Sequence, residues 1–88
     1  METKCVLTGF AIVVADRGFV YVGNVEVTSE YCIMSNAKNI RRWGTSKGLG
    51  ELALNGPQSE TKLDDVGSLR IFKHAVNHII DTDESKWK

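Results

Sequence analysis

The stretch Ala37–Pro57, which reads AKNIRRWGTSKGLGELALNGP, is the segment on which the interpretation of the fold depends. Thr45 and Ser46 are predicted to cap a helix, because a hydroxyl oxygen can accept a hydrogen bond from a free amide of the first helical turn. Apolar residues then follow at helical spacing. Gly56-Pro57 is a stop signal, since glycine adopts the left-handed conformation after a helix and proline cannot continue it. The stretch therefore predicts one short helix near residues 48–54.

The same stretch concentrates positive charge beside an aromatic side chain. Residues 37–56 carry four basic residues against one acidic residue, a local charge of +3 in a chain whose net charge is zero. A helix N-terminus with nearby Lys and Arg can bind an anion, and an indole can stack on a base. The residues predicted to bind a ligand are Arg41, Arg42, Trp43, Thr45, Ser46 and Lys47. The competing interpretation is a solvated basic face, with Trp43 packed in or at the rim of the core.

The length and composition of the chain are those of one small globular protein. It has 88 residues, of which 42% are hydrophobic and 25% are charged, so we expect a single domain over 1–88 with a charged C-terminal tail at 81–88. Because the core is modest, we expect a homo-oligomer, most often a dimer. No apolar run is long enough to span a bilayer and no signal peptide is evident, so the expected location is the cytoplasm. Cys5 and Cys32 are then expected to be reduced and buried.

The first half of the chain has the pattern of β-strands. Residues 5–14 (CVLTGFAIVV) and 19–28 (FVYVGNVEVT) are rich in β-branched side chains and predict two strands separated by a turn. Gly23 lies within the second of these segments and predicts a bulge or a sharp bend there. A third strand is predicted over residues 31–36, and residues 37–43 are candidates for its extension.

The second half of the chain is less clear from pattern alone. The polar residues 57–67 predict a loop. Residues 69–80 (LRIFKHAVNHII) place apolar side chains at helical spacing, which predicts an amphipathic helix. Their β-branched content instead favours two short strands, at 69–72 and 75–80. The fold class at this point is either mainly β or α+β with a C-terminal helix at 69–80.

Three groups of residues resemble a family of small uncharacterised proteins encoded by bacteriophages and prophages. They are Asn36–Thr45 (NAKNIRRWGT), Gly48–Ala53 (GLGELA) and Gly56-Pro57, and the resemblance extends from about Phe19 to Ile80. It implies a phage accessory protein with no catalytic residues to carry over, and it favours strands over a helix at 69–80. The layout also resembles a small SH3-like or Sm-like barrel with a helical insertion, so the expected fold is mainly β with one short helix. Likeness of fold does not assign a function.

Catalytic and metal chemistry find little support in the sequence. His74 and His78 are four residues apart, but a metal site needs further ligands, and the remaining candidates are scattered. The cysteines lie in apolar segments, where a thiol is usually inert. We therefore expect no enzyme activity, no metal and no cofactor.

Two classes of function then remain open. The first is a phage-type accessory binding protein that modulates or blocks a host process, for example host defence, through an anionic ligand such as a nucleotide or nucleic acid. The alternative is a protein–protein interaction module, acting on a host protein, or a self-assembling module, with no such ligand. Salt dependence separates the two classes, because phosphate contacts weaken steeply with salt and apolar interfaces do not.

Overall fold

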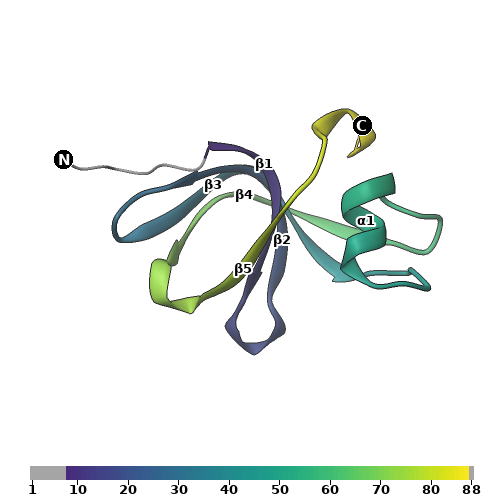
Figure 1. The fold of residues 1–88 in the computed structure, drawn as a ribbon, viewed down its shortest axis with the longest axis horizontal. Coiled ribbons are helices and arrows are strands. Elements are labelled where there is room, and N and C mark those ends of the chain that lie inside the picture. Colours follow the sequence, from purple (N-terminus) through teal and green to yellow (C-terminus); the bar gives the residue numbers. More distant parts are fainter. Residues whose placement is uncertain (1–7, 88) are drawn as a thin grey trace.

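The computed structural model describes residues 8–87, which form five β-strands and one short α-helix (Figure 1). The strands are β1 (Thr8–Ala15), β2 (Val20–Val27), β3 (Tyr31–Arg42), β4 (Lys62–Phe72) and β5 (Val76–Asp81), and the helix is α1 (Leu49–Asn55). Three 3₁₀ turns complete the described chain: η1 (Asp16–Gly18), η2 (Lys73–Ala75) and η3 (Glu84–Trp87). The mainly β prediction with one short helix is confirmed. The prediction that Cys5 is reduced and buried concerns a residue outside this range.

The strands form one antiparallel sheet in the order β4-β3-β2-β1-β5. Its two edge strands, β4 and β5, are consecutive in the chain and are joined by η2 alone. The sheet therefore has to curl to bring its edges toward each other, and Figure 1 shows β4 and β5 approaching at this turn. This arrangement agrees with the small-barrel layout expected from the sequence. The alternative helix at 69–80 is wrong, because η2 separates two strands there.

Two further features of the sheet test the sequence interpretation. The register between β2 and β3 shifts at Gly23, as predicted, and an ideal Cβ on this residue would lie 2.8 Å from the Cα of Ala37. The predicted loop at 57–67 is wrong in its second half, because β4 begins at Lys62. The polar side chains of this part of β4 are mostly exposed, as suits an edge strand. An exposed edge strand lacks the hydrophobic pattern by which a buried strand is recognised in the sequence.

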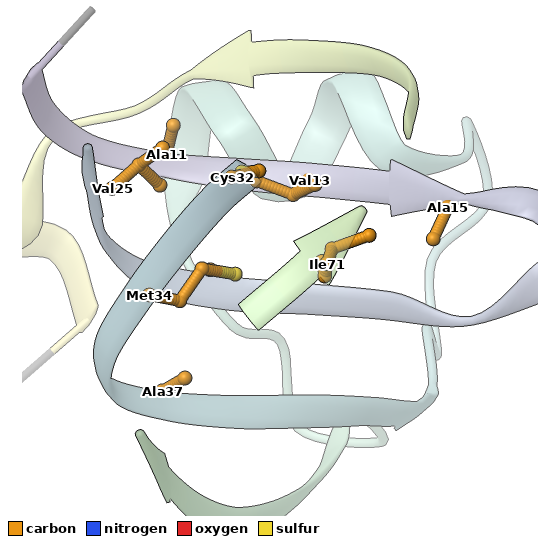
Figure 2. Close-up of a cluster of buried hydrophobic side chains, with 8 residues drawn as sticks. All are labelled: Ala11, Val13, Ala15, Val25, Cys32, Met34, Ala37 and Ile71. Atoms are coloured by element: carbon orange, nitrogen blue, oxygen red, sulfur yellow. The ribbon is translucent and has the colours of Figure 1, made fainter. Parts of the chain in front are cut away.

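The core is divided into two clusters that lie on opposite sides of β1. Successive residues of a strand point to opposite faces. Ala11, Val13 and Ala15 therefore belong to the first cluster, which Figure 2 shows together with side chains from β2, β3 and β4. Ile12 belongs to the second cluster, where it packs with residues of β2, β3 and α1. The apolar content on both faces of β1 is thus accounted for within one chain.

The C-terminal segment docks over the second cluster. The hydroxyl of Thr82 donates a hydrogen bond of 2.6 Å to the carbonyl oxygen of Ala53, near the end of α1. The same hydroxyl accepts a hydrogen bond of 3.0 Å from the indole Nε1 of Trp87, whose ring lies 6.3 Å from that of Phe10. The predicted tail at 81–88 is therefore attached to the domain as far as Trp87, although its charged side chains remain exposed.

Candidate functional site

The predicted site lies where the chain leaves β3 and enters α1. Arg41 and Arg42 are the last two residues of β3, and both are exposed. Trp43 follows them, and 42% of its surface is exposed, so it is not a core residue. Thr45 is half-buried, whereas Ser46 and Lys47 are exposed in the connection to α1. The six predicted residues thus form one continuous segment at one end of the sheet.

Arg41 is neutralised by an acidic residue on the neighbouring strand. Its Nε lies 2.7 Å from Oδ2 of Asp64 on β4, and this hydrogen bond together with the charge of Asp64 raises the pKa of Arg41 above its usual value. Lys38 makes a similar pair, with Nζ 2.6 Å from Oδ1 of Asp65, which lowers the pKa of that carboxyl. Two of the four basic residues behind the local charge of +3 are therefore paired.

The amides of the segment are occupied by a carboxylate of the same chain. Oε1 of Glu51 accepts hydrogen bonds from the backbone amides of Ser46, at 3.2 Å, and Lys47, at 3.0 Å. Thr45 and Ser46 do not cap α1, so that prediction is wrong: Gly48 is the N-cap and has no side-chain cap. The Thr45 hydroxyl instead accepts a hydrogen bond from the amide of Gly48 and donates one to the carbonyl oxygen of the same residue, just before the helix. A phosphate could reach the Ser46 and Lys47 amides only by displacing Glu51.

A smaller group of cations remains at this end of the sheet. Arg42 lies directly opposite Lys62 of β4 in the sheet register, and both side chains are exposed. Neither they nor Lys47 form an ion pair within residues 8–87. Lys62 was missed by the sequence interpretation, because only the pairing of β3 with β4 brings it beside Arg42. We call Arg42, Trp43, Lys47 and Lys62 the basic patch.

The backbone beside Trp43 is held by the loop before β4. The hydroxyl of Thr61 donates a hydrogen bond of 2.7 Å to the carbonyl oxygen of Trp43. Gly44 has a φ of 65°, and an ideal Cβ there would collide with the backbone carbonyl of Glu60. The side chain of Glu60 is the acidic group of this loop and is exposed. The backbone that carries the indole of Trp43 is thus held by the loop before β4.

The remaining candidate chemistry gains no support from the structure. His74 lies in η2 and His78 lies on β5. Within residues 8–87 no three His, Cys, Asp or Glu side chains gather as metal ligands do. Cys32 is a free, buried thiol, and burial raises its pKa. No helix in the described part of the chain combines the length and the apolar character needed to cross a membrane.

Comparison with known proteins identifies no relative of this chain: no protein-family model, no curated protein and no solved structure matches it.

Proposed function

We propose that the protein is a non-enzymatic binding module whose basic patch recognises an anionic, base-containing ligand, either a nucleotide or a single-stranded nucleic acid. The observation that carries the proposal is the pair of Arg42 and Lys62, which stand opposite each other without an acidic partner among the described residues. Like charges directly opposite on neighbouring strands repel, and an anion placed between them relieves this repulsion. Arg41, by contrast, already has its counter-ion in Asp64.

The neighbouring Trp43 supports a ligand that carries a base as well as a phosphate. Its indole is exposed and directly follows Arg42 in the chain, and base–aromatic stacking contributes about 1–3 kcal/mol per base. Lys47, which forms no ion pair among the described residues, adds a third cation on the other side of Trp43 in the sequence. The site proposed here therefore keeps Arg42, Trp43 and Lys47 from the sequence prediction and adds Lys62. It leaves out Arg41, Thr45 and Ser46, because each of them forms hydrogen bonds within the chain.

The biological role that we propose is the one implied by the resemblance to small phage-encoded proteins. In that role the protein acts in the cytoplasm of the host and modulates or blocks a host process by binding.

The proposal is tested by measuring fluorescence anisotropy of a labelled single-stranded oligothymidine, and competition by ATP, over a series of salt concentrations. Arg42→Ala and Lys62→Ala should each weaken binding by about 1.5–3 kcal/mol, the range for a hydrogen bond to a charged group. Each variant should also reduce the slope of log affinity against log salt by about 0.7. Arg17→Asn is the matched control, because it removes one charge at the far turn, where asparagine tolerates the φ of 67°.

Unchanged affinity in both patch variants would reject the basic patch as the site. Failure of the wild-type protein to bind either probe, together with recovery of a protein partner whose binding is insensitive to salt, would instead support the interaction module.

A further inference from the structure

A second exposed surface lies at the opposite end of β3 from the basic patch. Tyr31, the first residue of β3, stands opposite Phe72, the last residue of β4. Their ring centres are 5.6 Å apart. The ring of His74 stacks on Phe72 at 5.9 Å with an angle of 17° between the planes. We call these three rings the aromatic row.

The aromatic row borders an open groove between the β2–β3 turn and η2. The groove has a volume of about 530 Å³ and is lined by Ser29, Glu30, Tyr31, Phe72, Lys73 and His74. Phe72 is 60% exposed even though it contacts rings on both sides. An aromatic side chain left this exposed beside other rings offers a flat apolar surface on which another planar group can stack.

The groove is held in shape by hydrogen bonds from two backbone amides. The amide of Lys73 donates a hydrogen bond of 2.9 Å to the carbonyl oxygen of Glu30, which ties η2 to the β2–β3 turn. Within that turn, the amide of Tyr31 donates to the hydroxyl of Thr28 at 3.1 Å. The surface therefore needs little ordering before a ligand binds, which lowers the entropic cost of association.

The charges around the aromatic row favour an anion. The guanidinium of Arg70 lies over the ring of Tyr31, at 5.6 Å from its centre, and Lys73 lines the groove. Glu30 is the acidic residue of the lining, so these three residues carry a charge of +1 in a chain whose net charge is zero. Neither Arg70 nor Lys73 forms an ion pair within the described chain.

We propose that the aromatic row is a second stacking surface, which binds a base of single-stranded nucleic acid while Arg70 and Lys73 contact the adjacent phosphates. Rows of exposed rings flanked by cations bind single strands in this way without sequence preference. The inference rests on the proposed function for the class of ligand, but it uses a different surface and can fail separately.

The test is anisotropy of a labelled oligothymidine of about 12 nucleotides at low salt, with the full chain. Phe72→Ala should weaken binding by about five- to 150-fold, the effect of losing one stacked base. Phe19→Ala is the matched control, because Phe19 is a comparably exposed phenylalanine, at 53%, in the turn between β1 and β2. Phe72→Leu keeps an apolar side chain without an aromatic face and should resemble Phe72→Ala. In NMR spectra, the ring protons of His74 should shift when the oligonucleotide is added.

The outcomes separate the two proposals. If Phe72→Ala binds as tightly as Phe19→Ala while Arg42→Ala weakens binding, the aromatic row is not a site and the basic patch stands. If only Phe72→Ala weakens binding, the aromatic row is supported and the basic patch fails. Binding of ATP at Phe72 with no affinity for the oligonucleotide, or of a proline-rich peptide in its place, would overturn the inference.

Discussion

Thr82 is the residue at which the attachment of the C-terminal segment can be tested most directly. Its hydroxyl donates to the carbonyl oxygen of Ala53 and accepts from the indole of Trp87, so one oxygen atom, just after the end of β5, joins α1 to η3. Ala53 belongs to the last turn of α1, where the carbonyl groups have no partner within the helix. Thr82→Val keeps the shape of the side chain but removes both hydrogen bonds.

The expected cost follows from these two bonds. A hydrogen bond contributes about 0.5–1.5 kcal/mol net, so the loss of both should lower the free energy of unfolding by about 1–3 kcal/mol. With a denaturant dependence of about 1 kcal/mol per molar urea for a chain of this size, the unfolding midpoint should fall by about 1–3 M. The midpoint is measured by circular dichroism and tryptophan fluorescence during urea denaturation.

Two controls make the test of Thr82 specific. Thr82→Ser keeps the hydroxyl and loses one methyl group, which should cost about 1 kcal/mol or less. Trp87→Phe keeps a ring against Phe10 but removes the donor, and its effect should be smaller in the Thr82→Val background than in the wild type. Equal midpoints for Thr82→Val and Thr82→Ser would refute the reasoning, because the hydroxyl would then contribute nothing.

Three further predictions concern the core and the turns. Gly44→Ala should lower the thermal stability clearly more than Gly18→Ala, as measured by thermal unfolding. Both residues have positive φ, which costs an alanine about 1–2 kcal/mol, but only at Gly44 would the new methyl group collide with backbone atoms. Leu52→Ala, at a fully buried position of α1, should destabilise by about 2–5 kcal/mol, whereas Leu54→Ala, at a position 73% exposed, should change the urea midpoint by less than about 0.5 M. Burial raises the pKa of the Cys32 thiol, so its contribution to stability is complete below the pKa of an unfolded cysteine and is lost as the pH rises through the folded value. Because this thiol is buried, native protein should react with thiol reagents at Cys32 only as fast as it unfolds, and a fast reaction at neutral pH would contradict this.

The parts of the fold that depend on local chemistry could be predicted from the sequence. The β-branched runs indicated the first strands. The helix end could be predicted at Gly56 because the chain needs a positive φ there, 83°, and glycine is the residue that favours it. The helical spacing in 69–80 was misleading on its own. Phe72, one of the residues on the supposed helical face, is exposed at the end of β4, and η2 follows it immediately.

The parts of the candidate site that depend on strand register could not be predicted. The sequence grouped Arg41 with Arg42, but only the alignment of β3 with β4 gives Arg41 a carboxylate partner and gives Arg42 a second cation. The residues that meet across these strands are about 20 positions apart in the chain, and a shift of one residue would exchange their faces. The aromatic row was missed for the same reason, because Tyr31 and Phe72 are distant in the sequence.

The position of β1 between two hydrophobic clusters has a consequence for how the chain opens and how it can diverge. A strand that forms a wall of both clusters cannot leave one without exposing the other, so the two should unfold in a single cooperative step rather than in succession. The amide hydrogens of residues 11–14 should accordingly be among the last to exchange with deuterated solvent, at a free energy close to that of global unfolding. Almost none of these side chains faces solvent, so few substitutions are tolerated there. Related chains should therefore retain small and branched apolar residues at these positions, while their turns vary in sequence.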